Sequence, residues 1–437
     1  MSARRRSCAV GPASKLPVVR RSTRFSGGRA MNGMGMGSIR TIQYDPFPRL
    51  EYEGRVERAR RLMKEHAIDA VLATSEHNLR YFIGEPSTTP QQTTRPRFLL
   101  ILSSGEPIAV VPEGIDQFYK DTTWVKNCRS WPSPNPKDEG VSALAGALRE
   151  LLPEDAKIGV ELGAESRLGF PAGDFLRVAD AIKPRTFVDA SDPIFTPLRM
   201  IKSPLEIDRI RTVCRLVSEA FDNLAAKLRL GMTEREVCRQ FEFECFSRGV
   251  EKTSKIVGVS GHGGYTRPYG VPTDKVLSDG DVLFIDAGCL FDFYWSDFDR
   301  HFAFGAPDPH TQDAYQVVWE ATEAGIAAAK PGVPICDVWS AMSAVLNGSN
   351  NRGKATNIGR MGHSMGLWMP ELPSLQPDDQ TILKPGMIIN IEPSTAYPSY
   401  FDGSPKLMLH EEVVVVTDTG PQLLTSRAPQ KMPVVAK

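Results

Sequence analysis

The stretch DVLFIDAGCLFDFYWSDFDR, residues 281–300, most constrains how this chain can fold. VLFIDAG is an apolar run, LFDF can form a corner, and YWSDFDR alternates large apolar with polar residues, so the pattern predicts a two-stranded hairpin. Asp286 ends the first strand and Asp297 stands in the second, so folding back can bring both carboxylates to one point. Buried like charges repel strongly unless a positive charge lies between them. The hairpin therefore indicates a metal site, while solvated turn aspartates remain the alternative.

Composition limits the class of protein. A chain of 437 residues, 41% hydrophobic and 24% charged, is long enough for two globular domains, and no apolar run reaches the length of a membrane span. The formal net charge is zero, but residues 1–44 carry nine Lys or Arg and no acid. The remainder has 43 bases against 52 acids, which argues against a nucleic-acid partner. We therefore expect a globular protein with neither a membrane nor a nucleic acid as partner.

The seven cysteines are scattered and include no C-x-x-C pair. This usage predicts reduced thiols and a cytoplasmic location, not a disulfide framework or a zinc-thiolate site. Each cysteine is interpreted as a small buried hydrophobe, and only Cys289, beside the hairpin, lies near a candidate site.

Three regions are expected along the chain. Residues 1–44 read as a disordered basic tail, interpreted either as an organelle transit peptide or as the product of a misassigned start codon, with the true start near Met31, Met34 or Met36. Residues 45–192 alternate strands with helices and predict an α/β domain. Residues 193–430 mix helices with antiparallel strands and predict an α+β domain.

Local signals place the elements within these regions. Ser203 and Pro204 begin a predicted helix that Gly231 ends, and Thr233 with Glu236 has the spacing of a capping box for the next helix. NLRYFIG, residues 78–84, is interpreted as a turn. The other predicted helices cover 51–68, 141–152, 311–330 and 335–347, and the strands cover 68–75, 97–104, 107–112, 157–162, 387–393 and 406–417.

Three stretches after the hairpin carry further candidate ligands. His363 stands between glycines in GRMGHSMG, where an imidazole can project from a loop. Glu392 ends the apolar strand MIINIEP, where an unpaired carboxylate would be costly. Glu411 and Glu412 begin a valine run and point to opposite faces of it. Each residue alone has an ordinary structural explanation as a loop histidine, a cap or an ion-pair partner.

Taken together, these stretches resemble a known family. Asp, a second Asp eleven residues later, His in G-H-S, Glu in I-E-P and Glu before V-x-V-T resemble the ligand set of the pita-bread metallohydrolases, which include methionine aminopeptidase, aminopeptidase P, prolidase and creatinase. NLRYFIG, RMIKSPLEIDRIR, LSDGDVLFIDAG and LKPGMIINIEP resemble the creatinase, aminopeptidase P and prolidase branch. The resemblance covers the chain from about residue 50 and implies a creatinase-like N-terminal domain before a pita-bread catalytic domain.

The resemblance also implies a cofactor and a chemistry. Two divalent metal ions would be held by Asp286, Asp297, His363, Glu392 and Glu411, with Glu411 chosen over Glu412 because V-x-V-T aligns that way. Four carboxylates balance two divalent ions, and oxygen-rich ligands favour manganese first, with iron, cobalt or zinc as alternatives. Such ions can activate a shared water for attack on a carbonyl, which is amide hydrolysis.

The sequence departs from the family pattern at positions thought to contact substrate. Tyr269 and Pro370 stand where the peptidases have histidines, while Glu371 is retained as a catalytic proton shuttle or supporting group. Asp299 replaces the usual Thr or Ser and is interpreted as a sixth ligand, a catalytic acid, or a partner of Arg300 or a backbone amide. Arg267, Tyr265 and Tyr269 are the candidate substrate-binding residues, and Arg267 can equally belong to a structural ion pair.

Three functions follow from these observations. The first is a dinuclear metallohydrolase of a small peptide or other small amide, most simply an Xaa-Pro dipeptidase. The second, suggested by the missing histidines, is a relative of creatinase, ectoine hydrolase or the dimethylsulfoniopropionate lyases that acts on a small nitrogen compound or compatible solute. The third is a binding module without activity. Family resemblance further implies a homodimer.

Overall fold

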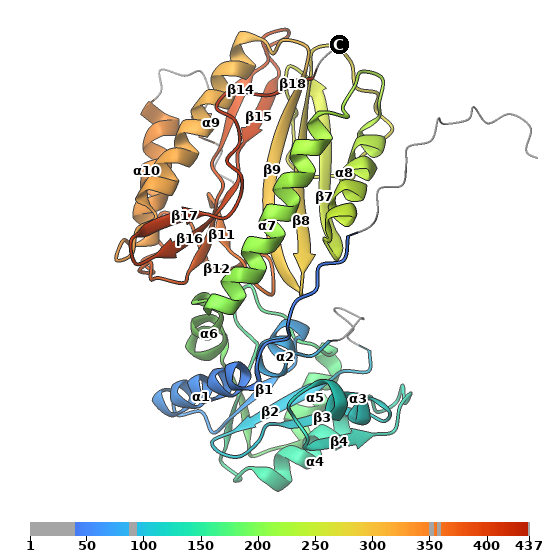
Figure 1. Ribbon diagram of the computed structural model, residues 1–437. Coiled ribbons are helices and arrows are strands. Elements are labelled where there is room, and N and C mark those ends of the chain that lie inside the picture. The colour runs from blue at the N-terminus through green and yellow to red at the C-terminus, as the bar shows by residue number, and fades with distance from the viewer. Residues whose placement is uncertain (1–39, 87–93, 349–353, 356–359, 436–437) are drawn as a thin grey trace, which may run out of the picture. The chain divides into compact units, whose positions relative to one another are not determined.

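Two lobes make up the part of the chain that the computed structural model describes, residues 40–86, 94–348, 354–355 and 360–435 (Figure 1). Most of the predicted basic tail lies outside the described residues. The two lobes belong to one compact unit that begins at residue 39. The fold class predicted from the sequence, an α/β domain followed by an α+β domain, is confirmed.

The N-terminal lobe is built on a six-stranded mixed sheet in the order β4-β3-β2-β1-β5-β6. Strands β1, β2 and β3 pair antiparallel, whereas β1 with β5, β5 with β6 and β3 with β4 pair parallel. The strands are β1 Ala70–Ala73, β2 Phe98–Leu102, β3 Ile108–Pro112, β4 Cys128–Trp131, β5 Lys157–Val160 and β6 Thr186–Asp189. The helices are α1 Arg49–Glu65, α2 Glu76–Ile83, α3 Ile115–Thr122, α4 Val141–Leu151 and α5 Ala172–Ala181.

One element of this lobe contradicts the sequence interpretation. Residues predicted as a turn belong to α2, which ends at Gly84 in the left-handed conformation (φ 68°). Seven of the eight residues of α2 are buried, including His77 and Arg80. Half of the residues of α2 are polar or charged although nearly all of them are buried, and eight residues are fewer than the roughly 11 to 18 over which a helical period can be recognised.

Helices connect the two lobes. η1 Ser191–Phe195 and α6 Thr196–Met200 lead to α7 Pro204–Ala225, which is followed by α8 Glu234–Arg248. Both predicted N-caps, Ser203 and Thr233, are confirmed as capping boxes, although α7 ends six residues before the predicted stop at Gly231. None of the helices in the described residues combines the length and apolar character that crossing a membrane would require.

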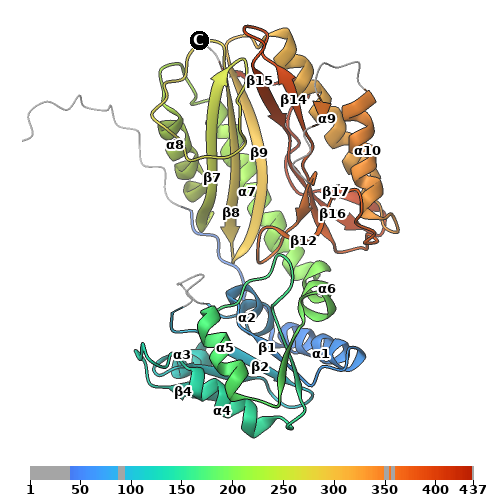
Figure 2. The same cartoon turned by 180° about the vertical axis from the view of Figure 1, so that it is seen from behind.

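The C-terminal lobe contains three sheets, in the orders β18-β9-β8-β7, β12-β11-β13-β16-β17 and β10-β14-β15. Helices α7 and α8 pack on β7–β9, whereas α9 packs on β14 and β15 with α10 beside it (Figures 1 and 2). The bounds are β7 Lys252–His262, β8 Asp281–Phe291, β9 Tyr294–Phe304, α9 Pro309–Ala328, α10 Ile335–Gly348, β10 Lys354–Ala355, β11 His363–Ser364, β12 Glu371–Ser374, β13 Ile388–Ile391, β14 Ser394–Pro398, β15 Pro405–Leu409, β16 Glu412–Thr417, β17 Gly420–Leu423 and β18 Val434–Val435.

The predicted hairpin is confirmed as β8 and β9, joined by the two-residue turn Asp292-Phe293. Both turn residues have positive φ, 46° and 64°, as the right-handed twist of a tight hairpin requires. Arg209 of α7 donates to the Asp292 carboxylate at 2.7 Å. The turn sets the register, which places Asp286 directly opposite Asp299 and Gly288 opposite Asp297.

Gly362, which precedes His363 of β11, tests how tightly the backbone is packed here. A Cβ at Gly362 (φ 129°) would lie 1.9 Å from the Asn390 carbonyl oxygen, whereas one at Gly420 (φ 123°) would meet nothing within 4 Å. We expect Gly420→Ala to lose about 1–2 kcal/mol of stability from backbone strain. Gly362→Ala should lower the unfolding temperature distinctly more than Gly420→Ala does, because the added methyl group would force β11 away from Asn390 of β13. Equal unfolding temperatures of the two variants would show that the backbone around Gly362 can shift to make room for the methyl group.

Candidate metal centre

One face of the β8–β9 hairpin carries the polar residues of the site. Side chains alternate along a strand, so cross-strand pairs two residues apart share a face. The carboxylates of Asp286, Asp297 and Asp299 are therefore on one face, together with the Trp295 and His301 side chains. From the turn inward, the pairs on this face are Leu290 with Trp295, Gly288 with Asp297, Asp286 with Asp299 and Phe284 with His301.

Three of the five predicted ligands converge in space. Asp297, His363 and Glu411 are buried, and one ligand atom from each lies within 4.8 Å of the others. His363 Nε2 lies 3.8 Å from Asp297 Oδ2 and 4.0 Å from Glu411 Oε1. Asp286 and Glu392 interact electrostatically with the same carboxylates. The structure thus brings together residues that are up to 125 positions apart in the sequence.

Lys255 is a site residue that sequence reasoning missed. It lies on β7 beside Gly288, and the missing side chain of that glycine lets the ammonium reach across the strand. Lys255 Nζ lies 2.8 Å from Asp286 Oδ2 and 3.2 Å from Asp297 Oδ1. Burial opposes the charge on Lys255, but the Asp297 and Asp286 carboxylates outweigh it and raise its pKa. Because β7 was not predicted as a strand, nothing in the sequence placed Lys255 on this face.

The carboxylates crowd one another strongly. Burial, followed by the charge of Asp286, raises the pKa of Glu392 to about 7, against the cation Lys255. Burial also raises the pKa of Asp286 to about 6, and burial with Asp297 raises the pKa of Glu411 well above its usual range. Asp286 Oδ1 is buried and has no hydrogen-bond partner in the described part of the chain. Such a concentration of hard oxygen donors fits divalent cations, whose charge would remove the repulsion.

One ring nitrogen of His363 faces the carboxylates and the other faces a backbone carbonyl. Burial lowers the pKa of His363 to about 3, so the imidazole is neutral at physiological pH. Its Nδ1 lies 2.9 Å from the Ser364 carbonyl oxygen, which can accept an Nδ1–H hydrogen bond. That tautomer leaves the Nε2 lone pair facing Asp297 and Glu411, and a backbone carbonyl is a common outer partner of metal-binding histidines.

The two neighbouring glutamates occupy different surroundings. Asn390 Nδ2 donates to Glu411 Oε1 at 2.6 Å, which orients Glu411 toward His363. Glu412 instead accepts from Arg427 and from the Ala428 amide, and it pairs with Arg300. Glu412 therefore holds a structural ion-pair network, and these contacts favour Glu411 as the ligand.

Glu371 is surrounded by cations. Arg199 donates to one carboxylate oxygen, and Lys202 Nζ lies 3.4 Å from the other. The Trp368 amide donates to the same carboxylate at 3.0 Å. Burial alone would raise the pKa of Glu371, but Arg199 and Lys202 outweigh burial and lower it. These contacts keep Glu371 ionised, and both of its predicted roles, as a proton shuttle or as a supporting group, stay predictions.

The structure argues against Arg300 or a backbone amide as the partner of the Asp299 carboxylate, and against the predicted substrate contact of Tyr265. The interpretations of Asp299 as a sixth ligand or a catalytic acid stay predictions. Arg300 binds the backbone carbonyl of Asp299, and the Asp299 carboxylate faces His301 and His410, not the Arg300 guanidinium. Tyr265, a predicted substrate contact, is only 1% exposed, and its hydroxyl lies 3.1 Å from His301 Nε2. The Tyr265 ring stacks on Phe284, so Tyr265 is a packing residue in the interior of the lobe.

Tyr269 and Arg267 do lie at the surface. The Tyr269 side chain is 67% exposed, and Arg267 is also exposed. Their predicted contact with substrate stays a prediction.

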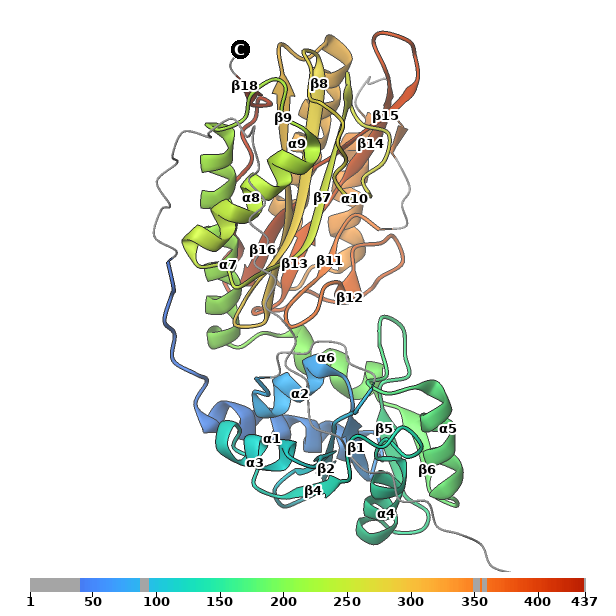
Figure 3. The same cartoon turned by 90° about the vertical axis from the view of Figure 1, so that its right-hand side faces the viewer.

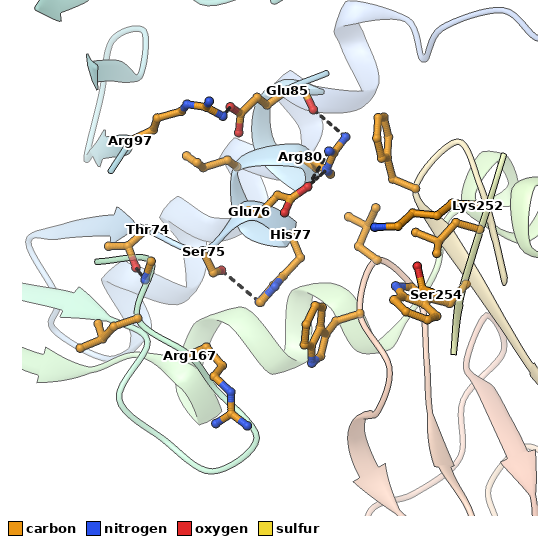
Figure 4. Close-up of a pocket in the computed structure, with 18 of the residues that line it drawn as sticks. Thr74, Ser75, Glu76, His77, Arg80, Glu85, Arg97, Arg167, Lys252 and Ser254 are labelled. Carbon is orange, nitrogen blue, oxygen red and sulfur yellow. Dashed lines mark hydrogen bonds and ion pairs between the residues drawn. The ribbon is translucent and has the colours of Figure 1, made fainter. Parts of the chain in front are cut away.

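A pocket of about 730 Å³ lies at the turn end of the hairpin (Figure 4). It contains none of the predicted ligands, but Trp295 lies on the same hairpin face as Asp297, and Ser254 precedes Lys255. The pocket therefore adjoins the ligand cluster. Its charged lining is mainly basic, with Arg80, Arg95, Arg97, Arg167 and Lys252 against Glu76 and Glu85.

The fold and the ligand cluster define a metal-dependent hydrolase of the pita-bread class. The model of metallopeptidase family M24 matches residues 208–418, and that of the creatinase/prolidase N-terminal domain matches residues 55–201. The chain belongs to this family, whose members use two metal ions, and is a metallohydrolase.

Known relatives cover most of the chain. The chain is 27% identical over 372 residues to a Pyrococcus furiosus Xaa-Pro dipeptidase, and the aligned region covers 85% of this chain and 97% of that protein. The crystal structure of the dipeptidase PepE from Mycobacterium ulcerans superposes with a TM-score of 0.75 at 25% identity, over 90% of this chain and all of that one. A Thermococcus sibiricus prolidase, at 23% identity and a TM-score of 0.75 over 88% of this chain and 99% of that one, shares the fold.

Replacement of Glu371 separates a positioning role from a catalytic one. Glu371→Gln leaves the buried Lys202 and the partly buried Arg199 without their carboxylate, so we expect a loss of about 3–5 kcal/mol in stability. Glu323→Gln, which removes a partly exposed partner of Arg427, is the matched control and should cost less than about 1 kcal/mol. Thermal unfolding measures both. A Glu371→Gln protein with wild-type unfolding temperature and no activity would instead support the proton shuttle.

The raised pKa of Glu392 predicts a pH dependence of the metal-free protein. The pKa of Glu392 is higher in the folded than in the unfolded protein, so protonated Glu392 favours the folded state. This contribution to stability is full below about pH 4.5 and is lost as pH rises through 7. Between these two pH values, we expect the free energy of unfolding of the chelator-treated wild-type protein to fall by on the order of 1–3 kcal/mol more than that of Glu392→Gln. Unfolding temperatures of both, with Glu219→Gln as an exposed control, measure this. Identical pH profiles would contradict the electrostatic explanation.

Proposed function

We propose that this chain is a dinuclear metallopeptidase that cleaves small peptides, most simply Xaa-Pro dipeptides. The observation that carries the proposal is the convergence of Asp297, His363 and Glu411 next to Asp286 and Glu392. Residues of these types, in this order along the chain, can hold two divalent ions. The names of the relatives from Pyrococcus furiosus and Mycobacterium ulcerans support a dipeptidase.

The metal ligands, Lys255 and Glu371 have different roles in such a reaction. Bound divalent ions would supply an activated water and stabilise the negative charge that develops on the attacked carbonyl oxygen. The four carboxylates and His363 hold the ions in place. Lys255, 2.8 Å from Asp286, can orient a carboxylate ligand or donate a hydrogen bond to a bound substrate. Glu371, held by Arg199 and Lys202, fixes the segment between β11 and β12 near His363.

The adjoining pocket supports an anionic small substrate. Five basic side chains line it against two glutamates, and a dipeptide carries a free carboxylate that arginine binds well. Part of this charge is already used: Arg97 pairs with Glu85, and Arg80 pairs with Glu76. Trp295 and Trp368, whose rings meet edge to face, supply an apolar wall that suits a proline ring.

A second candidate function has its own observation. Tyr269 and Pro370 stand where resemblance places substrate-contacting histidines, so the residues that bind an ordinary peptide differ here. This change favours a relative that acts on a small nitrogen compound or compatible solute. The chemistry would still require the metal centre, because all five ligand positions are retained.

Three finer features complete the proposal. Manganese is the first choice of metal because oxygen donors dominate the ligand set, with iron, cobalt or zinc as alternatives. The location is cytoplasmic, as the six free cysteines of the described residues suggest. The protein acts as a homodimer, as resemblance to the family implies.

A substrate panel with a ligand variant tests the proposal. Wild-type protein loaded with Mn²⁺ should hydrolyse Ala-Pro or Gly-Pro and leave creatine and ectoine unchanged. Glu392→Gln should lower kcat/KM by about 100-fold or more, because it removes a charged ligand of the centre. Glu219→Gln, on the exposed surface of α7, should keep wild-type activity. Turnover of a solute alone would favour the second function, and full activity of Glu392→Gln would refute the metal mechanism.

A further inference from the structure

A second polar cluster, formed by Asp299, His301 and His410, lies deeper along the same hairpin face. None of these three side chains is more than 2% exposed. His301 Nδ1 lies 3.6 Å and His410 Nδ1 lies 3.7 Å from Asp299 Oδ1, and both separations exceed a hydrogen bond. One ligand atom from each residue lies within 4.8 Å of the other two. The three groups thus face one point without bonding to one another.

Five polar atoms of this cluster have no hydrogen-bond partner among the described residues. They are both carboxylate oxygens of Asp299, Nδ1 of His301 and both ring nitrogens of His410. Each such buried group costs about 1–3 kcal/mol unless something satisfies it. Aromatic rings close the surroundings, since Tyr315 packs against His410 at 4.6 Å and Phe284 against His301 at 5.1 Å. A convergent set of unsatisfied donors and acceptors calls for a partner such as a bound ion or an ordered water.

The histidines are arranged as metal ligands. The Tyr265 hydroxyl lies 3.1 Å from His301 Nε2, so the tautomer with a proton on Nε2 directs the Nδ1 lone pair toward Asp299. An outer hydrogen bond of this kind orients most metal-binding histidines.

We propose that Asp299, His301 and His410 bind a divalent transition-metal ion, with Zn²⁺ or Fe²⁺ as the expected class, at a site separate from the carboxylate centre. Metal bonds of about 2.0–2.2 Å separate neighbouring ligand atoms by about 3.0–3.5 Å, so the observed 3.6 and 3.7 Å need only a small contraction. Two imidazole nitrogens with one carboxylate select these ions over Mg²⁺ or Ca²⁺.

The position of this second site gives it a structural task. Asp299 and His301 belong to β9, whereas His410 lies between β15 and β16. Asp297 and Glu411, two predicted ligands of the carboxylate centre, are close neighbours of these residues in the sequence. An ion at the second site would therefore lock Asp297 of β9 and Glu411, which directly precedes β16, into one geometry.

Anomalous X-ray scattering tests the assignment directly. Crystals of the full chain soaked in Zn²⁺ and measured at the zinc absorption edge should show one peak between Asp299, His301 and His410. Further signal is expected near Asp297, His363 and Glu411. Zinc content measured by elemental analysis after desalting should be higher by about one atom per chain in the wild type than in His410→Leu.

Two matched variants separate the sites. His410→Leu should lose the deep peak and keep the signal near His363, and His363→Leu should do the reverse. The proposal is overturned if the wild-type crystals hold zinc near His363 but only a water, without anomalous signal, at the deep cluster. Because the wild-type crystal decides this point, a variant that fails to fold does not obscure the answer. If wild-type crystals show zinc at the deep cluster but none near His363, the result counts against the proposed catalytic centre and not against this site.

Discussion

The mutual repulsion of four buried carboxylates is the interaction on which the rest of the catalytic lobe depends. Asp286, Asp297, Glu392 and Glu411 cannot all be charged in one dry volume without positive charge between them. In this structure Lys255 supplies one such charge, and burial together with the remaining repulsion between carboxylates raises the pKa values of Asp286, Glu392 and Glu411. The cluster is therefore costly as a purely structural feature, which is why a metal-binding function explains it.

The β8–β9 hairpin organises this chemistry by its two-residue period. Along a single face, the pocket wall at Trp295 is followed by Asp297 with its ligand partners, and then by Asp299 with its two histidines. The other face packs on α7, where Phe298 meets Phe221. One strand pair thus separates an apolar core from a row of polar sites. A register shift of one residue would exchange the two faces and bury no ligand correctly.

The N-terminal lobe contributes to the site through its contacts with the hairpin and with the segment after β11 (Figure 3). Arg80 of α2 lies over the ring of Phe293 at the hairpin turn, and His77 packs against Trp368. The buried Arg55 of α1 pairs with Glu206 of α7 at 3.4 Å. These contacts explain why α2, which carries no predicted ligand, is buried almost completely and lines the pocket.

The sequence by itself determined the hairpin, the N-caps of two helices, the fold class and the order of the five candidate ligands. Those features depend on local periodicity or on short motifs. Lys255, His301 and His410 were not predicted, because their importance arises from strand pairing between distant segments. Only the tertiary structure decided that Gly288 leaves room for Lys255 and that Tyr265 supports His301 inside the lobe. It also decided that the Asp299 carboxylate faces two histidines, since cross-strand register sets these contacts and local sequence does not encode it.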